Sequence, residues 1–404
     1  MFSSIPEILD DVRAGKLVIL VDDEDRENEG DLVLAAQHAT PELVHHMNLF
    51  AGGYLCLSLT EHDCDRLDLH PMTAVNTSRR GTPFTVSIDA HPKHGVTTGV
   101  SAADRAKTIR LAIDPDSKPS DFVKPGHINP LRSRDGGVLV RTGQTEGAVD
   151  LARLAGCHPS ALIIEIVRPD GAMARRPDLE RMCAEHALKM CSIEQIIEHR
   201  LRGETMVRRV DPASGVDIET EFGRFRLIAF ESSVDPLPHL ALTAGGVGEL
   251  DASGAARRTD EPTLVRMHRR DLLGDIFGEL RPEKPGGTAD STSKTLRAAM
   301  RAIASEGRGA IVYLRPEGVG DGFEQRLTAL KRGVGHADHD APDLSSPTGV
   351  GAAALPMHQR EFGIGGQILR ELGLSRLRLL TNQKKELPGL DAFGLEIVDH
   401  VALQ

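Results

Sequence analysis

Short blocks of apolar and polar residues alternate along the chain and predict both strands and helices. Continuous or alternating apolar runs are typical of strands, and in the first half they occur at 17–21, 53–60, 84–89, 138–141 and 161–167. Apolar positions spaced by three or four residues, preceded by capping residues, predict helices, here at 4–14, 41–50, from about 101, 144–154, 178–190 and 192–201.

The second half follows a similar pattern after a polar stretch. Residues 201–215 are polar and end in turn formers, so we divide the chain into domains 1–204 and 205–404. Beyond the boundary, strands predicted at 224–230, 263–267, 309–314 and 376–380 are interleaved with helices at 291–306 and 362–372. This order favours a layered α/β second domain after a mixed α+β first domain. The His-, Asp-, Pro- and Gly-rich segment 335–351 is predicted to be a mobile loop.

Composition limits the functional classes. The chain has 404 residues, enough for two domains, and 48 basic against 59 acidic residues give a net charge of −11. This charge, with no Trp and 3% aromatic residues, disfavours nucleic acid as a partner. We find no apolar run near the ~20 residues of a membrane span and no signal-peptide pattern. We therefore expect a cytoplasmic protein that acts on a small molecule.

Residues 22–31 are the most unusual stretch in the chain. They hold seven carboxylates, one Arg and one Gly directly after the strand predicted at 17–21. Carboxylates at this density repel one another unless cations, a metal or water compensate. A solvated acidic loop is the alternative interpretation. Because a buried strand delivers these oxygens to a fixed place, and hard oxygen ligands suit Mg²⁺, we favour a metal-assisted site.

Three further features carry candidate chemistry. The segment 95–104 runs from a Gly-containing loop into a capped helix, which can bind a phosphate. The segment 138–146 predicts a strand, an Arg, a Gly turn and a helix start, which is a plausible phosphate cradle. Glu165 is a lone carboxylate on an apolar strand and needs a partner or a function. The five cysteines, all before residue 200 and without CxxC spacing, predict reduced thiols.

Six blocks in order resemble the 3,4-dihydroxy-2-butanone 4-phosphate synthase family and cover about residues 1–204. They lie at 22–31, 95–105, 118–121, 125–127, 136–141 and 170–175. The resemblance implies conversion of D-ribulose 5-phosphate to 3,4-dihydroxy-2-butanone 4-phosphate and formate in riboflavin biosynthesis, with Mg²⁺ or Mn²⁺, by a homodimer. Forming and rearranging an enediol requires positioned acid–base groups and a Lewis acid.

The same resemblance assigns residues to roles. It implies metal ligation by Glu27 and at position 144, and proton transfer by His127 and Glu165. The substrate would contact Arg26, Glu27, Asp31, Cys56, Arg141, Thr142, Gly143, Gln144, Thr145 and Glu165. The chain departs from the family at Gln144, where a His is usual. The Gln carbonyl oxygen can coordinate Mg²⁺ but cannot act as an imidazole base, so we expect the metal preference to move away from ions that favour nitrogen.

The second half resembles GTP cyclohydrolase II in the blocks 266–275, 306–309, 313–318 and 378–382. That family holds a catalytic Zn²⁺ with three Cys, the first of which would fall at Asp271 and the others within 281–287. The chain has no Cys after residue 191, so we expect neither zinc nor GTP opening there. The segment 317–322 is also altered, and His358 stands where an Asp is expected, although Arg360 remains.

Three functional hypotheses follow. The first is a working synthase whose degenerate second domain supports packing or assembly, or else is an inert remnant. The second is a bifunctional enzyme that also has GTP cyclohydrolase II activity. The third is a non-catalytic regulator of riboflavin synthesis, in which Gln144 marks loss of the first activity. Retention of the acid–base and Arg positions named above weighs against the third hypothesis.

Overall fold

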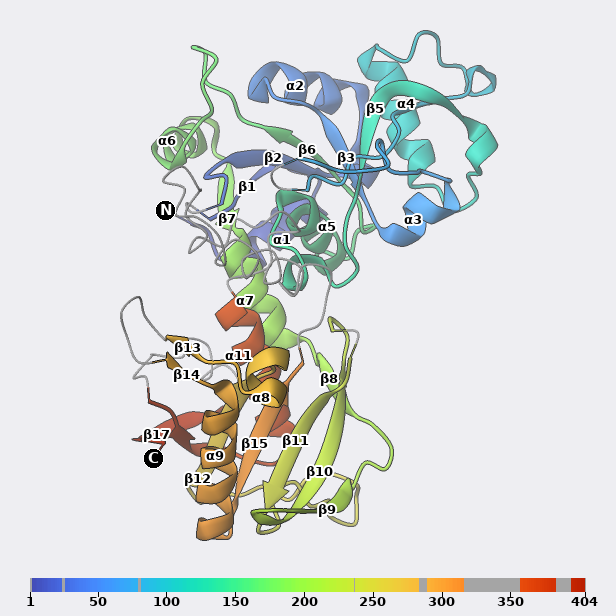
Figure 1. Cartoon of the computed structure of the whole chain (residues 1–404). Helices are drawn as coiled ribbons and strands as arrows, with labels where there is room; N and C mark the ends of the chain where they lie inside the picture. The colour runs from blue at the N-terminus through green and yellow to red at the C-terminus, as the bar shows by residue number, and fades with distance from the viewer. Residues whose placement is uncertain are drawn as a thin grey trace, which may run out of the picture. The chain divides into compact units, whose positions relative to one another are not determined.

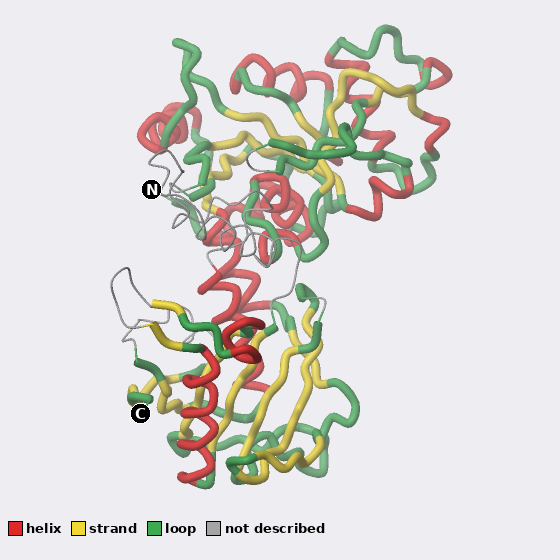
Figure 2. Tube along the Cα trace, viewed as in Figure 1, coloured by secondary structure: helices red, strands yellow, loops and turns green. Residues whose placement is uncertain are grey.

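The computed structural model describes residues 2–23, 26–78, 81–235, 237–282, 289–315, 357–382 and 394–403. The described residues up to Arg200 form one compact unit, and those from Leu201 onwards form a second (Figures 1 and 2). The predicted mobile loop 335–351 lies outside the described residues.

The first unit is built around a seven-stranded sheet. Its strands are β1 (Val18–Val21), β2 (Gly30–Ala35), β3 (Cys56–Leu59), β4 (Ile88–Ala90), β5 (Phe122–Arg132), β6 (Ala161–Glu165) and β7 (Lys189–Ser192). Their order across the sheet is β4-β5-β3-β6-β2-β1-β7. The β3–β5 and β1–β7 pairs are parallel and the other pairs antiparallel, which makes the sheet mixed.

Helices cover both faces of this sheet. They are α1 (Ile5–Arg13), η1 (Ala36–His38), α2 (Pro41–Ala51), α3 (Glu61–Arg66), η2 (Pro92–His94), α4 (Ala102–Ala112), η3 (Pro119–Asp121), η4 (Gly137–Leu139), α5 (Gln144–Leu154), α6 (Arg176–His186) and α7 (Ile193–Gly203). Three begin at the predicted caps: Glu7 accepts from the Ser4 backbone (3.1 Å), Thr40 Oγ1 from Leu43 N (3.2 Å) and Ser101 Oγ from Asp104 N (3.1 Å).

Strand alternation separates a core face from a polar face. Even-numbered residues of β2 such as Leu32, with Leu57 of β3, pack into one apolar cluster with Met47 of α2 and Ile109 of α4. The opposite face lies against α5, where Leu20 of β1 approaches Gly147. Figure 1 shows α2 and α5 on opposite sides of the sheet. The side chains on the α5 face include the candidate site residues.

Several elements of the first unit differ from the prediction, among them the strand expected at 84–89, where the strand that forms, β4, spans only Ile88–Ala90. The apolar run at 138–141 is not a strand: η4 occupies it, because Gly136 and Gly137 adopt positive φ and turn the chain so that Val138 is buried without joining a ladder. The helix predicted at 178–190 ends at His186, because Ala187 is left-handed and Lys189–Ser192 pairs in parallel with β1. In the second case, pairing with a strand far along the chain overrides the local pattern.

The second unit is a layered α/β structure. Its large sheet has the order β17-β16-β12-β15-β11-β10-β8, with β9 pairing to β10. The strands are β8 (Val207–Arg209), β9 (Val216–Thr220), β10 (Gly223–Ser232), β11 (His239–Ala244), β12 (Thr263–Arg269), β15 (Gly309–Leu314), β16 (Arg376–Leu380) and β17 (Glu396–Val401). The remaining elements are α8 (Leu272–Phe277), β13 (Arg281–Pro282), β14 (Ala289–Asp290), α9 (Thr292–Glu306) and α11 (Met357–Glu371).

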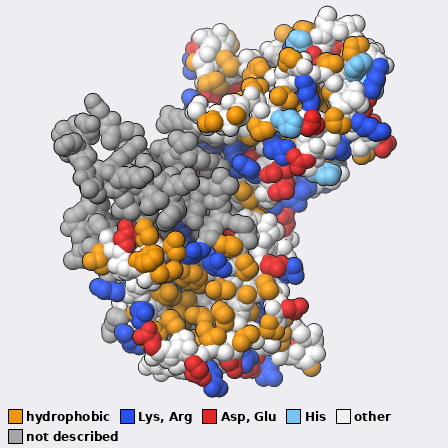
Figure 3. Space-filling view, turned by 45° about the vertical axis from the view of Figure 1, so that its right-hand side comes forward, with side chains coloured by type: hydrophobic (Ala, Val, Ile, Leu, Met, Phe, Trp, Pro, Cys, Tyr) orange, Lys and Arg blue, Asp and Glu red, His pale blue; other side chains and the backbone are white. Residues whose placement is uncertain are grey.

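Helices α9 and α11 pack on opposite faces of this sheet. Ile303 of α9 lies in one cluster with Leu264 and Ile311, whereas Gly365 of α11 approaches Met267, which points to the other face of β12. The two-domain α+β and α/β class expected from the sequence is confirmed. In Figure 3, hydrophobic side chains gather over the second unit, while charged and histidine side chains are frequent over the first. Among the described helices, none is long and apolar enough to cross a membrane.

Candidate active site

The acidic stretch is the connection between two neighbouring strands. Val21 at the end of β1 pairs with Gly30 at the start of β2, so the described residues 22, 23 and 26–29 lie in the connection between the two strands. Asp22 organises this loop, because its two carboxylate oxygens accept from the backbone of Glu29 (2.8 Å) and Glu27 (3.0 Å). Burial raises the pKa of Asp22, and the Glu29 amide and Arg26 oppose the rise. Sequence reasoning did not single out Asp22; its only signal was its place directly after the strand.

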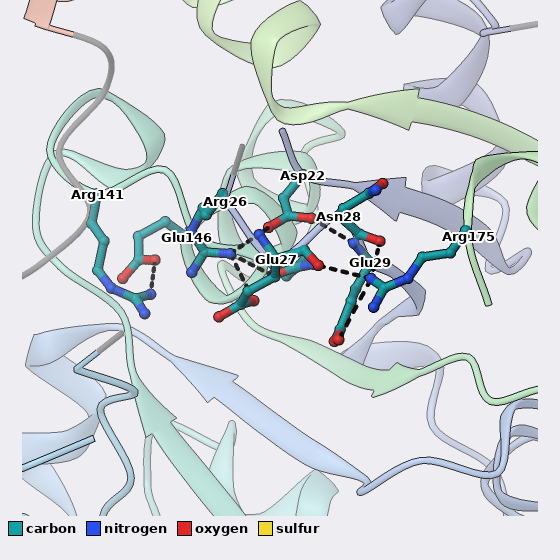
Figure 4. A network of polar contacts seen from close by, with 9 residues as sticks. Asp22, Arg26, Glu27, Asn28, Glu29, Arg141, Glu146 and Arg175 are labelled. Carbon is teal, nitrogen blue, oxygen red and sulfur yellow. Dashed lines mark hydrogen bonds and ion pairs between the residues drawn. The ribbon is translucent and has the colours of Figure 1, made fainter. Parts of the chain in front are cut away.

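Arg26 brings three acceptors together at one nitrogen. Its Nη1 lies 2.7 Å from Asp22 Oδ2, 2.8 Å from Glu27 Oε2 and 3.1 Å from Gln144 Oε1 (Figure 4). The Arg26 side chain is 7% exposed, so these are contacts in a dry environment where charge-assisted hydrogen bonds are strong. The loop after β1 and the first residue of α5 therefore meet at Arg26, although 118 positions separate Arg26 from Gln144.

The two predicted metal positions, Glu27 and Gln144, are thus placed side by side. Both offer side-chain oxygens to the same cationic nitrogen, and Gln144 Nε2 is buried with no hydrogen-bond partner in the described chain. Within the described residues, no three His, Cys, Asp or Glu side chains are grouped as a metal site. The candidate centre consists of one carboxylate and one amide oxygen, with Asp22 beside them.

Arg175 fixes the far side of the acidic loop. Its Nη1 donates to the carbonyl oxygens of Glu27 (2.8 Å) and Asn28, whose φ of 54° is left-handed. Figure 4 shows Arg175 with Glu29 on one side of Arg26 and the Arg141–Glu146 pair on the other. Arg175 was not among the predicted site residues; the signal for it lay in the block at 170–175.

A second group of candidate residues shares one face of the sheet. Asp31 of β2 pairs directly with Glu165 of β6, and Cys56 of β3 pairs with Ile163, two positions before Glu165. Residues that pair directly, or stand two apart, point to the same face. Asp31, Glu165 and Cys56 therefore all point to the α5 side of the sheet. Glu165 is not the lone acid that the sequence suggested, because Asp31 stands beside it.

Burial and like charge set the protonation of this group. Burial, followed by the charge of Glu165, raises the pKa of Asp31 well above its ordinary value. Burial likewise raises the pKa of the Cys56 thiol, with Glu165 and Asp31 adding to the rise, so the thiol is protonated and a poor nucleophile. Glu165 Oε2 accepts from Tyr54 N at 2.8 Å, which orients the carboxylate.

His127 reaches the same face from β5. Cys56 also pairs with Asn129, two positions after His127. His127 and Glu165 are therefore at the same height along β3, His127 on the strand to one side and Glu165 on the strand to the other. Two strand spacings separate them, roughly 10 Å. The imidazole is paired with Asp89: His127 Nδ1 lies 2.7 Å from Asp89 Oδ2.

The start of α5 holds the remaining predicted residues. Gly143 caps the helix with no side-chain hydrogen bond, and Thr142, Gln144 and Thr145 are buried around it. Arg141 is 4% exposed and its Nη1 lies 2.6 Å from Glu146 Oε2. Burial raises the pKa of Glu146, against the opposing charge of Arg141. The helix start presents the positive end of the α5 dipole, which suits an anion.

Comparison with known proteins agrees with these observations. The family model of 3,4-dihydroxy-2-butanone 4-phosphate synthase matches residues 6–199, and that of GTP cyclohydrolase II matches residues 212–402. The chain is 45% identical over 404 residues to a riboflavin biosynthesis protein RibBA of Aquifex aeolicus, covering 100% of this chain and 93% of that protein. A RibBA of Salinispora tropica is 43% identical over 403 residues, with coverage of 100% and 93%.

A solved structure spans both units. The crystal structure of RibBX, a two-domain 3,4-dihydroxy-2-butanone 4-phosphate synthase from A. baumannii, superposes with a TM-score of 0.73 at 34% identity. It covers 100% of this chain and 99% of that one.

Proposed function

The chain belongs to the 3,4-dihydroxy-2-butanone 4-phosphate synthase family of lyases, and from that premise we propose that its first unit converts D-ribulose 5-phosphate to 3,4-dihydroxy-2-butanone 4-phosphate and formate. This is a reaction of riboflavin biosynthesis. The observation that carries the proposal is the meeting of Arg26, Glu27 and Gln144 at one point, in the unit whose sheet face carries Asp31 and Glu165.

The donor set fits a hard divalent cation. The oxygens of Asp22, Glu27 and Gln144 already converge on a positive charge, the Arg26 guanidinium. We propose that Glu27 and Gln144 hold Mg²⁺ or Mn²⁺, which prefer such oxygen ligands. Gln144 Nε2 has no partner in the described chain. The side-chain amide can therefore rotate toward a metal ion and would lose only its hydrogen bond with Arg26. The ion would act as a Lewis acid on the substrate oxygens.

Proton transfer falls to the residues of the sheet face. We assign Glu165 and His127 as the groups that accept and return protons, with Glu165 oriented by Tyr54 N. Asp31, whose pKa burial and Glu165 raise, can donate a hydrogen bond to a substrate oxygen while it holds its proton. Cys56, protonated and buried, contacts the substrate without acting as a nucleophile.

Substrate anchoring uses the positive end of the site. Arg26 binds substrate hydroxyls, and Arg141 with the backbone of Thr142, Gly143, Gln144 and Thr145 receives the phosphate. The first N–H groups of α5 have no partner within the helix itself, as in any α-helix, and the helix dipole favours an anion there. The ion pair with Glu146 fixes Arg141 in place before the substrate arrives.

The experiment is an assay of the purified full chain for formate release from ribulose 5-phosphate, with and without EDTA. Metal-dependent release is expected. No release with added Mg²⁺ or Mn²⁺ would leave the non-catalytic regulator as the better hypothesis. The proposal includes a homodimer, for which light scattering should give twice the chain mass.

We further propose that the second unit does not open GTP, although the relatives named RibBA and the match to the GTP cyclohydrolase II model favour the bifunctional alternative. Asp271 stands where the first zinc cysteine would fall and instead caps α8 by accepting from Gly274 N (3.2 Å). The other two positions, within 281–287, and the altered segment at 317–322 lie largely outside the described residues. Zinc content by mass spectrometry, with a GTP assay, separates the two alternatives.

A further inference from the structure

His127 is held by a buried carboxylate that uses both of its oxygens on this residue. Asp89 Oδ2 lies 2.7 Å from His127 Nδ1, and Asp89 Oδ1 accepts from His127 N at 2.9 Å. The Asp89 side chain is 9% exposed, whereas the His127 side chain is 45% exposed. One edge of the imidazole is therefore fixed inside the protein while the rest of the ring is accessible.

An irregularity in the ladder creates this contact. Ile88 of β4 pairs with Ile128 of β5, but the next residue, Asp89, pairs with Val123. Residues 124–127 of β5 are therefore inserted into the ladder as a bulge. Such bulges redirect side chains and are frequent next to active sites. Ile128 belongs to the apolar core, so the neighbouring His127 points to the opposite face, where Glu165 and Asp31 lie.

The turn before α4 closes over Asp89 from the other side. Gly99 has a φ of +84°, and a Cβ at this position would lie 2.1 Å from Asp89 Oδ2. Asp104 anchors the turn, because its Oδ2 accepts from Gly99 N (3.1 Å) and Thr97 Oγ1 (2.8 Å). The backbone next to Asp89 is fixed as well, since Ala90 N donates to Thr108 Oγ1 at 2.9 Å. The carboxylate thus has one orientation, with His127 as its partner.

We propose that Asp89 is a positioning residue that fixes the tautomer of His127. A carboxylate accepts only, so Nδ1 must carry the hydrogen, and Nε2 is left with its lone pair toward the substrate side. A proton taken from the substrate then binds Nε2, the Nδ1–H stays with Asp89, and the negative carboxylate stabilises the imidazolium until that proton returns. The effect on catalysis rests on the proposed synthase function, whereas the assignment of the tautomer is independent of that function.

The first test is spectroscopic and uses the full chain labelled with ¹⁵N-histidine. The signals of His127, one of 17 histidines, are identified by their loss in His127→Gln. At a pH where the ring is neutral, the Nδ1–H tautomer is expected in the parent. In Asp89→Asn, the amide can donate to Nδ1, so the hydrogen is expected to move to Nε2. A parent with the hydrogen on Nε2 overturns the proposal without any variant at Asp89.

The second test measures kcat and KM for ribulose 5-phosphate. General acid–base groups contribute about 10²–10⁴-fold, so Asp89→Asn is expected to lower kcat at least ~10-fold with KM within ~2-fold. The double variant with His127→Gln should be no slower than His127→Gln alone, because Asp89 acts through His127. If the losses in kcat of the two single variants instead multiply in the double variant, Asp89 has a merely structural role and the proposal is overturned.

Asp121→Asn provides the matched control. Asp121 forms a similar pair, with His94 Nε2 at 3.0 Å from its Oδ1, and is placed nowhere in the catalytic machinery. It should leave kcat unchanged, and an equal loss in both variants would contradict a specific role for Asp89. If the parent itself does not release formate, the synthase proposal fails, whereas the tautomer of His127 in the parent and in Asp89→Asn still decides the positioning role.

Discussion

Asp31 on β2 and Glu165 on β6 stand directly opposite each other in an antiparallel ladder, so two carboxylates share one side of the sheet. Burial and the charge of Glu165 together raise the pKa of Asp31. Two carboxylates in such a place destabilise the fold when both are ionised. The pair is therefore better explained by chemistry than by stability, and it leads to the first prediction.

Replacing Glu165 should abolish turnover without loss of stability. The charge of Glu165 disfavours ionisation of Asp31. Glu165→Gln, which keeps an acceptor for Tyr54 N, should therefore be as stable as the parent or slightly more stable at pH 7. Glu165→Leu should likewise be inactive and folded. Formate assays and thermal melting measure the two effects. A large fall in melting temperature would instead indicate that Glu165 is a structural carboxylate.

The sequence predicted local structure well where the signal was local. The strand before the acidic loop, the caps at Ser4, Thr40 and Ser101, and the helix that begins at Gln144 were all recognisable from neighbouring residues. The pairing of Asp31 with Glu165 was not, because 134 positions of chain separate these two residues and nothing local specifies that register. For the same reason the local pattern predicts no strand over 122–132, where β5 carries His127.

The roles of supporting residues were the least predictable. Asp22, Asp89 and Arg175 hold Arg26, His127 and the acidic loop through hydrogen bonds that exist only once distant segments meet. A carboxylate in the sequence carries no mark of the side chain it will orient. The resemblance supplied the proposed catalytic positions, and the structure supplied these neighbours.

Glu27→Gln should remove metal binding and leave the fold intact. The carboxylate is one of two proposed ligands, so its loss should lower turnover more than ~100-fold and weaken Mn²⁺ binding measured by electron paramagnetic resonance. Arg26 keeps Asp22 and Gln144, and a Gln at position 27 keeps an oxygen acceptor for Arg26, so the variant should remain folded in a thermal melt. Glu185→Gln, the same change at an exposed position, is the control. Unaltered Mn²⁺ affinity in Glu27→Gln would contradict the ligand assignment.

A buried cluster makes the stability of the second unit depend on pH in the acidic range. Asp275 receives hydrogen bonds from His268 Nε2 (3.0 Å), Tyr313 Oη (2.8 Å) and Asp271 N (2.9 Å). Burial alone would raise the pKa of Asp275, but the hydrogen bonds from His268 and Asp271 N lower it to about 2. Because this folded value lies below the unfolded one of about 3.9, the contribution is complete above pH ~4 and is lost as the pH falls towards 2.

Asp275→Asn should therefore destabilise the second unit at neutral pH. Asn can satisfy only part of this set of donors, and a buried donor left without a partner costs about 1–3 kcal/mol. Denaturation of the parent and the variant from pH 7 to pH 2 measures the effect. The difference between their free energies of unfolding should become smaller below pH 4. A difference that stays constant over this range would show that the ionised form of Asp275 is not what stabilises the cluster. Tyr313→Phe, which removes one donor, should cost less.

Removing the second unit tests whether it supports the first. The unit keeps a buried core, with Phe225, Ile303 and Ile311 each at most 1% exposed, although the zinc cysteines are missing from the sequence. A domain that retains its packing without its proposed metal chemistry is expected to contribute through assembly or stabilisation. A chain that ends at Arg202 should then melt at a lower temperature or turn over ribulose 5-phosphate more slowly than the full chain. Neither protein should release formate from GTP. Full activity with unchanged melting in the shortened chain would favour an inert remnant, and zinc-dependent attack on GTP by the full chain would establish the bifunctional alternative.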